Sequence, residues 1–278
     1  HIQKIKPSDY HMSTLSSLEW LNRFLSETPG DSKIGGAARQ VPNACWSRVS
    51  PTPAPDAEVR LWSDEVAQLL ELSECDDEVL AGGKPVEGMD TYAQRYGGDQ
   101  FGNWAGQLGD GRAITLGEVQ TQSQVLELQL KGSGKTPYSR FADGKAVLRS
   151  SIREFLCSEA MHHLGVPTTR ALSLATTGEA VLRDMMYNGN REYEPGAVVC
   201  RVAPSFIRFG SFQIHTLMGD RKTLRTLVEH TIKNHFPNHH ANDDDGIIAW
   251  AKQIAKDTAI MVAHWMRVGF VHGVMNTD

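Results

Sequence analysis

Two strand-like segments followed by a long helix, in the middle of the chain, limit the fold more than any other feature. Residues 113–119 and 125–131 have the length of strands, and in the second of them polar and aliphatic side chains alternate. After a loop over residues 132–144, apolar side chains recur on one face of a predicted helix that ends before Gly165. The pattern predicts a half-buried strand pair that leads into an amphipathic helix.

The segments on either side add short strands first and helices later. Helical spacing over residues 60–81, with Ser63 as its N-cap, precedes a glycine-rich stretch. Further strands are predicted at residues 171–175, 180–183 and 197–202, and longer helices at residues 221–235 and 247–269. That order of elements is typical of an α+β fold whose second half is helical.

The charge of the chain argues against a general nucleic-acid-binding protein. The net charge is 28 − 33 = −5 over 278 residues, whereas contacts to a phosphate backbone require a basic surplus. A local basic cluster around a bound nucleotide stays compatible with this balance. We therefore expect no nucleic-acid partner.

Four cysteines and one apolar segment bear on the compartment. The cysteines lie at least 30 residues apart and form no C-x-x-C pair, which disfavours a zinc or dithiol site and predicts reduced, mostly buried thiols. Residues 247–271 are apolar but interrupted by charged side chains, so they predict a packed helix and not a membrane span. We expect an intracellular protein, cytoplasmic if its source is bacterial and mitochondrial if it is eukaryotic.

Lys131 and Glu154 form a candidate pair for positioning a nucleotide. Lys131 ends the alternating strand, and Glu154 lies 23 residues later on the predicted helix. In kinases a strand lysine holds the nucleotide phosphates while a helix glutamate fixes the lysine. Because such pairs are also common among solvated surface charges, the spacing alone leaves both interpretations open.

A glycine-rich segment over residues 107–112 stands directly before the strand pair. Glycines there let backbone N–H groups approach anionic oxygens, as in a phosphate-covering loop. The segment does not match G-x-G-x-x-G, and a tight hairpin turn is the alternative interpretation.

Residues 132–136, Gly-Ser-Gly-Lys-Thr, look like the end of a Walker A loop. The first glycine of that motif would fall on Gln129, and Pro137 disfavours the helical geometry that should begin there. A P-loop NTPase is therefore a poor fit.

Three further groups of residues are candidates for chemistry. The end of the chain, residues 270–278, reads as a His-Gly turn followed by Asn and Asp after a long helix, which is similar to the catalytic loop of kinase-like folds. Arg201 and Arg208 are suited to phosphate oxygens, with surface salt bridges as the alternative. His239 and His240, near three aspartates at residues 243–245, lack defined metal-ligand spacing and predict a solvated loop.

Longer stretches of sequence carry a resemblance to a known family. They are residues 96–102, 107–112, 130–140, 143–144, 146–155 and 272–278. Together these segments resemble the selenoprotein O family from about residue 92 to the end, whereas residues 1–91 are similar to it more loosely.

The resemblance implies a protein-kinase-like bilobal fold and a particular reaction. The family resembles a pseudokinase that binds ATP in a flipped orientation and transfers AMP to Ser, Thr or Tyr hydroxyls of proteins, with Mg²⁺ or Mn²⁺. It implies an N-terminal extension over residues 1–91, a kinase-like N-lobe over 92–200, and the start of an incomplete helical C-lobe over 201–278.

The resemblance also implies roles for individual residues. Asp278 matches the catalytic aspartate, and Glu154 orients the lysine. The residues implied to contact ATP are Gly109, Gly111, Arg112, Lys131, Asp143, Gly144, Arg201 and Arg208.

The chain begins at His1 and stops at Asp278, so we expect a piece of a longer protein. The metal ligands that the resemblance implies lie beyond Asp278, and the piece alone is expected to have weak or no activity. Three alternatives to AMP transfer stay open: an ordinary kinase-like phosphotransferase, a phosphotransferase for small molecules, and a non-catalytic ATP-binding pseudokinase.

Overall fold

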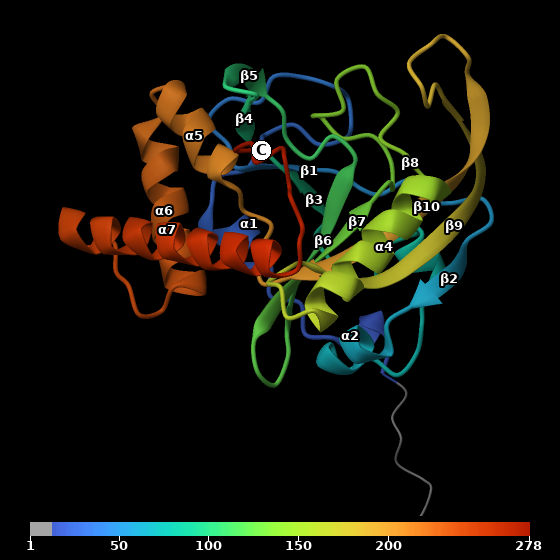
Figure 1. The fold of residues 1–278 in the computed structure, drawn as a ribbon, viewed down its shortest axis with the longest axis horizontal. Helices are drawn as coiled ribbons and strands as arrows, with labels where there is room; N and C mark the ends of the chain where they lie inside the picture. The colour runs from blue at the N-terminus through green and yellow to red at the C-terminus, as the bar shows by residue number, and fades with distance from the viewer. Residues whose placement is uncertain (1–12) are drawn as a thin grey trace, which may run out of the picture.

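The computed structural model describes residues 13–278 and shows a twisted antiparallel sheet flanked by helices. Within those residues the sheet has eight strands in the order β1-β3-β6-β7-β10-β9-β2, with β8 paired to β10 (Figure 1). The strands are β1 (Trp46–Arg48), β2 (Glu58–Trp62), β3 (Tyr92–Gln94), β6 (Ala113–Gln120), β7 (Val125–Lys131), β8 (Ala146–Val147), β9 (Arg170–Arg183) and β10 (Glu192–Ala203). A separate hairpin consists of β4 (Gly97–Gln100) and β5 (Asn103–Gln107).

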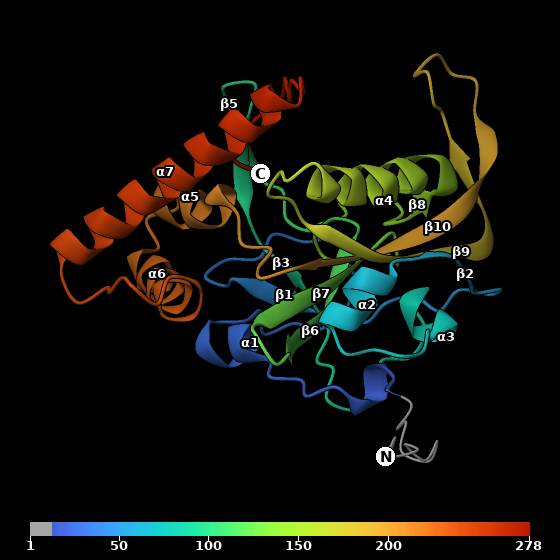
Figure 2. The ribbon, with the colours of Figure 1, turned by 60° about the horizontal axis from the view of Figure 1, so that its bottom comes forward.

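The helices divide into two groups around this sheet. The first group comprises η1 (Leu15–Ser17), α1 (Arg23–Glu27), α2 (Asp64–Leu69), α3 (Asp77–Leu80) and α4 (Leu148–His163). The second comprises α5 (Phe209–Leu217), α6 (Arg221–His235) and α7 (Asp244–Arg267), which gather to one side of the sheet (Figure 2). This mixture of helix and antiparallel sheet confirms the predicted α+β class.

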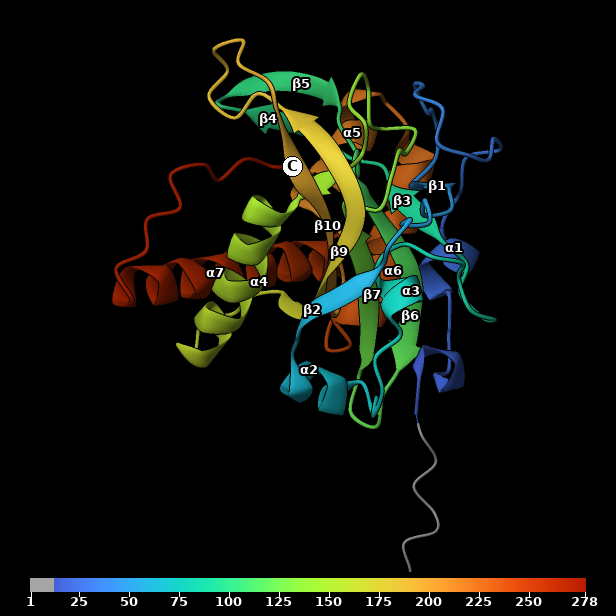
Figure 3. The same ribbon diagram turned by 90° about the vertical axis from the view of Figure 1, so that its right-hand side faces the viewer.

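The central strand pair and the helix after it lie where the sequence predicts them. β6 and β7 pair antiparallel from Ala113 opposite Lys131 to Gln120 opposite Val125. α4 follows and covers one face of the sheet (Figure 3). Its Phe155 packs against strands β9 and β10. The apolar face of α4 is less buried than predicted, since Leu156 is 54% exposed.

Two predictions about the elements before and after this unit are wrong. The expected helix over residues 60–81 is strand β2 followed by two short helices, because Leu61 pairs with Leu174 in the sheet. Ser63 does cap α2 as predicted, accepting a hydrogen bond from the Val66 N–H. The two strands predicted within residues 171–183 are one strand, β9, whose register shifts opposite residues 195–197 of β10 without ending the ladder.

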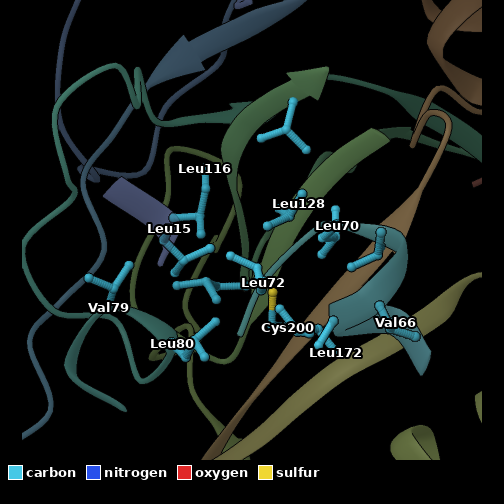
Figure 4. Close-up of a cluster of buried hydrophobic side chains, with 14 of the residues drawn as sticks. Leu15, Val66, Leu70, Leu72, Val79, Leu80, Leu116, Leu128, Leu172 and Cys200 are labelled. Atoms are coloured by element: carbon cyan, nitrogen blue, oxygen red, sulfur yellow. The ribbon is translucent and has the colours of Figure 1, made fainter. Parts of the chain in front are cut away.

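The main hydrophobic core lies on the sheet face opposite α4. Leu116, Leu128, Leu172 and Cys200 project from four strands and meet side chains of α2, α3 and η1 (Figure 4). A smaller core joins the helical group, where Trp250 of α7 packs on α6. Among residues 13–278, no helix is both long enough and apolar enough to cross a membrane.

All four cysteines are free, but only Cys45 and Cys200 are buried, so the expectation of mostly buried thiols is wrong for Cys75 and Cys157.

Strands β1 and β2, from the predicted N-terminal extension, belong to the same sheet as β6 and β7. Residues 1–12 of that extension lie outside the described residues, and the boundaries at residues 91 and 200 stay predictions.

Candidate active site

A cavity of about 850 Å³ opens where β6 begins and β7 ends. Its walls come from the β5–β6 connection, the loop over residues 138–145, the β9–β10 hairpin and the end of the chain. All but one of the predicted site residues line this cavity. The residues that do so are Gly109, Gly111, Arg112, Lys131, Asp143, Gly144, Arg201, Arg208 and Asp278. The exception, Glu154, lies behind Lys131 on α4.

Lys131 is held at the cavity wall by an ion pair. Its Nζ lies 2.6 Å from Glu154 Oε2, and the other oxygen of Glu154 lies 3.4 Å from Arg201 Nη1. Burial lowers the pKa of Lys131, and the Glu154 carboxylate opposes that shift. One carboxylate therefore fixes two cations at the end of strand β7 and on its neighbour β10.

Arg201 and Arg208 are two further cations that line the cavity, and both are partly buried. The Arg201 guanidinium lies 5.0 Å from the Phe206 ring centroid, and that of Arg208 lies 4.6 Å from the Tyr96 ring centroid. In the described part of the chain, the Nε atoms of both arginines are buried without a hydrogen-bond partner. Buried donors of this kind are rarely left unsatisfied, so these Nε–H groups are suited to donate hydrogen bonds to the oxygens of an anionic ligand.

The charges around the two arginines differ. Burial lowers the pKa of Arg201, although Glu154 opposes it. For Arg208, burial acts in the same direction, but Tyr96 and Asp110 outweigh it and raise the pKa. Asp110, whose Oδ1 lies 3.6 Å from Arg208 Nη2, is itself raised in pKa by burial.

A buried polar network behind the arginines was missed by sequence reasoning. Gln129 accepts a hydrogen bond from Arg201 and donates to Asp110 Oδ2 at 3.2 Å and to Thr115 Oγ1 at 3.1 Å. Glu127, two residues earlier on the same face of β7, accepts from Thr115 and from the Phe206 N–H at 3.0 Å each. The network thus connects the interior of the sheet to Arg201 and Arg208, and through Glu127 to Phe206, whose ring lies beside Arg201.

The alternation of strand β7 gave the wrong environment for this network. It predicted that Glu127 and Gln129 lie on a solvated face, yet they are 4% and 0% exposed. Local alternation shows which residues share a face, but it cannot show that chain from residues 92–96 and 203–208 covers that face. Nearby donors compensate the burial of these polar groups.

The glycine-rich segment over residues 107–112 connects β5 to β6 and borders the cavity. Gly109 has a φ of 74°, and a Cβ atom there would lie 2.3 Å from the Tyr138 ring. The Asp110 and Gly111 N–H groups donate to the carbonyls of Gln94 and Gly109. The glycines therefore allow close packing beside the cavity, while those two N–H groups already have acceptors.

The Walker-like residues 132–136 do not begin a helix. Thr136 Oγ1 donates to the Asp110 carbonyl at 2.6 Å, which ties the segment to the cavity wall.

Nearby, Asp143 accepts two hydrogen bonds from Arg183, at 2.7 and 2.8 Å. Burial acts to raise the pKa of Asp143, but the Arg183 guanidinium outweighs burial and lowers it.

Asp278 is placed by the β4–β5 hairpin, which the sequence did not reveal as a hairpin. The Asp99 N–H donates to Thr277 Oγ1 at 2.8 Å, and Gln100 Nε2 donates to Asp278 Oδ2 at 2.9 Å. A Cβ atom on Gly98 would lie 2.6 Å from that of Asp278, so only glycine allows this close approach. Within the described residues, Asp278 Oδ1 is buried and has no hydrogen-bond partner.

The histidine–aspartate segment leads directly into α7. Asp243 caps α7 by accepting a hydrogen bond from the Gly246 N–H at 2.8 Å. Residues 13–278 contain no group of three His, Cys, Asp or Glu side chains arranged to hold a metal ion. Capping therefore accounts for Asp243, while Asp244 and Asp245 lie in the first turn of α7.

The antiparallel sheet, the helix that supplies Glu154 and the helical group beyond Arg208 together define an α+β, protein-kinase-like fold. The sequence model of the family described as "Protein adenylyltransferase SelO" matches residues 33–278. The chain belongs to this family.

Curated relatives agree with this assignment. A "Protein nucleotidyltransferase YdiU" of Azoarcus sp. (strain BH72) is 60% identical over 264 residues, which are 92% of this chain and 51% of the relative. The protein of the same name from Methylobacillus flagellatus is 57% identical over 265 residues, with the same coverage. That from Rhodopirellula baltica is 59% identical over 269 residues, 92% of this chain and 50% of the relative. The chain spans about half the length of the curated relatives it matches.

Proposed function

We propose that the polypeptide carrying this chain is a protein adenylyltransferase, which transfers AMP from ATP to Ser, Thr or Tyr hydroxyls of other proteins. One observation carries the proposal: three cations converge with Asp278 in a cavity of about 850 Å³, large enough for a nucleotide. The description of the family and the names of the relatives support nucleotidyl transfer to protein.

The cations would bind the phosphates of ATP. Lys131 presents a point charge, while the unpartnered Nε atoms of Arg201 and Arg208 donate to phosphate oxygens. Glu154 orients Lys131 from behind the cavity wall. The remaining residues proposed to line the nucleotide site are Gly109, Gly111, Arg112, Asp143 and Gly144.

Asp278 would act on the acceptor hydroxyl. As the hydroxyl oxygen bonds to the α-phosphorus, Asp278 accepts its proton, the bond from the α-phosphorus to the bridging oxygen breaks, and pyrophosphate leaves. Gln100 occupies Oδ2 of Asp278 and leaves Oδ1 available for that proton. The fixed geometry of the carboxylate supports this role.

A divalent cation fits the proposal only in part. Among the carboxylates of the cavity, Asp143 is held by Arg183 and Asp110 is held by Gln94 and Gln129. Asp278 Oδ1 is proposed to take the acceptor proton, so the metal ligands are proposed to lie beyond Asp278, as the resemblance implies. Mg²⁺ often binds through one or two carboxylates together with substrate phosphates. When bound there, Mg²⁺ or Mn²⁺ would neutralise phosphate charge.

The test compares ATP labelled on the α-phosphate with ATP labelled on the γ-phosphate, using the full natural polypeptide and a mixture of proteins as acceptors. We expect protein labelled from the α-phosphate only, and a fall of about 10²- to 10⁴-fold in Asp278→Asn. Asp257→Asn, an exposed aspartate on α7, is the control and should label normally. Label from the γ-phosphate alone would replace the proposal with a kinase, and unchanged labelling in Asp278→Asn would exclude catalysis at this site.

A further inference from the structure

The turn of the β4–β5 hairpin has an unusual residue at its tip. Gln100 pairs with Asn103, so Phe101 and Gly102 form a two-residue loop, with φ values of 52° and 80°. A loop with two positive φ values favours Asn-Gly or Gly-Gly, because a bulky side chain is strained in this conformation. Phe101 adopts this strained conformation although its side chain is 78% exposed. Packing within the described chain therefore does not explain why a Phe stands at this position.

The hairpin that carries Phe101 is fixed to the chain end. The Phe101 N–H donates to Asn276 Oδ1 at 3.2 Å, in addition to the contacts of Asp99 and Gln100 with residues 277 and 278. Asp99 also accepts a hydrogen bond from Gln213 of α5 at 2.6 Å. Figures 1 and 2 show β4 and β5 beside the C-terminus. The turn is therefore held at a set position relative to Asp278.

Strain recurs at the mouth of the cavity. Of the six non-glycine residues with positive φ in residues 13–278, Arg140 and Tyr187 line the cavity, and Phe101 follows Gln100, which also lines it. Strained backbone conformations persist where the surrounding structure fixes them, and they concentrate at ligand-binding sites. Phe101 itself does not line the cavity, so a ligand contained in the cavity would leave its ring exposed.

We infer that Phe101 selects the acceptor, by contacting an apolar side chain next to the hydroxyl residue of a polypeptide; this inference rests on the proposed function. An acceptor hydroxyl that reaches Asp278 from outside the cavity brings its flanking residues toward the hairpin tip. An exposed ring fixed there buries apolar surface when such a residue docks. A small acceptor that fits inside the cavity would not make this contact.

The test uses two synthetic peptides that differ only beside a single central Ser, one flanked by Leu on both sides and one by Asn. The full natural polypeptide is supplied with ATP labelled on the α-phosphate. We expect kcat/KM to be about tenfold higher for the Leu-flanked peptide, with the difference mainly in KM, as for binding that is equal in ground and transition states.

Phe101→Asn is the informative variant because Asn-Gly is favoured in this turn, so the hairpin should be at least as stable. It should raise KM for the Leu-flanked peptide about tenfold and leave KM for ATP unchanged, whereas Phe101→Leu should keep the preference. Tyr193→Asn, an exposed aromatic residue on β10 outside the cavity, should behave as wild type.

Three results would overturn the inference. They are equal use of both peptides by the wild type, an undiminished preference in Phe101→Asn, and label on the enzyme itself but on neither peptide. Absence of α-phosphate label from every acceptor would remove the proposed function and this inference with it. The first three results leave the proposed function standing, so the two failures are distinguishable.

Discussion

Lys131 and Arg201 reach the cavity from strands of the sheet, and Arg208 reaches it from the N-cap of α5. Asp278, in contrast, reaches it from a chain segment held by a surface hairpin. The arginines are supported by the buried Gln129 and by the network behind it. Asp278 is supported by Gln100, a partly exposed residue outside the hydrophobic cores. On the sheet side the positions of the charges therefore depend on the core, while on the hairpin side they depend on a few surface hydrogen bonds.

This difference separates the effects of substitutions on stability from their effects on activity. Breaking the buried network should destabilise the protein, because each partner left behind is a desolvated polar group. Breaking the contact between the hairpin and Asp278 should alter the chemistry and leave the free energy of unfolding nearly unchanged, since water can replace the lost partner.

On the sheet side of the cavity, the largest expected effect is that of Lys131→Met on transfer. Removing one positioned charge from the phosphate site should lower kcat/KM for ATP about 10²- to 10³-fold. Glu154 keeps Arg201 as a partner at 3.4 Å, so the free energy of unfolding should change by about 1 kcal/mol or less. Steady-state labelling and denaturant unfolding measure the two quantities.

Lys252→Met, an exposed lysine on α7, is the matched control and should alter neither quantity. A Lys131→Met protein that kept more than a tenth of its activity would remove Lys131 from the phosphate site. A loss of several kcal/mol in stability would instead show that Lys131 supports the sheet.

The second effect is a pH dependence of stability from Glu127. Burial raises the pKa of this carboxyl from 4.5 to about 7 in the folded protein. Between pH 4.5 and 7 the folded state therefore binds more protons than the unfolded state, and the free energy of unfolding falls as the pH rises. The shift corresponds to about 3 kcal/mol lost across that window.

Three histidines whose pKa is lowered by burial, His215, His230 and His235, act in the opposite direction, so the effect of Glu127 must be isolated by difference. Burial lowers the pKa of His215 and His235 to about 4, so their contribution to stability rises with pH between 4 and 6.5. The stability of wild type minus that of Glu127→Gln cancels them and should fall by about 3 kcal/mol from pH 4.5 to 7. Denaturant unfolding at a series of pH values measures it.

Glu159→Gln is the control for this experiment. Burial acts to raise the pKa of Glu159, but the Arg170 guanidinium outweighs burial and lowers it. The contribution of Glu159 to the free energy of unfolding is therefore complete above pH 4.5 and is lost only at lower pH. Its difference from wild type should be constant from pH 5 to 8. A constant difference for Glu127→Gln as well would show that the buried network holds an ionised carboxylate throughout.

The sequence predicted the sheet side of the cavity better than the hairpin side. Lys131 and Glu154 sit on a strand and a helix whose periodicities are local, so their elements could be placed from short windows of sequence. The β4–β5 hairpin could not, because Phe101-Gly102 lacks the Asn-Gly signal and its strands contain four glycines or polar residues in a row, residues 97–100. Residue type and motif named Arg208 and Asp278 as candidates, but only the resemblance to a family implied that they share one site with Lys131.

The smallest expected effect, that of Gln100→Leu, tests the hairpin side most directly. Leu cannot donate to Asp278 Oδ2, so the carboxylate loses the contact that sets its orientation, and kcat should fall about tenfold, as for the loss of one hydrogen bond to a charged group. KM for ATP should hold, because Lys131, Arg201 and Arg208 do not contact Gln100. Thermal unfolding should stay within about 2 °C of wild type, because Gln100 lies outside the hydrophobic cores. Gln100→Glu should cost more than Gln100→Leu, since it places a second negative charge beside Asp278. A Gln100→Leu protein that lost stability as well as activity would show that both sides of the cavity depend on the core, and the contrast between them would not hold.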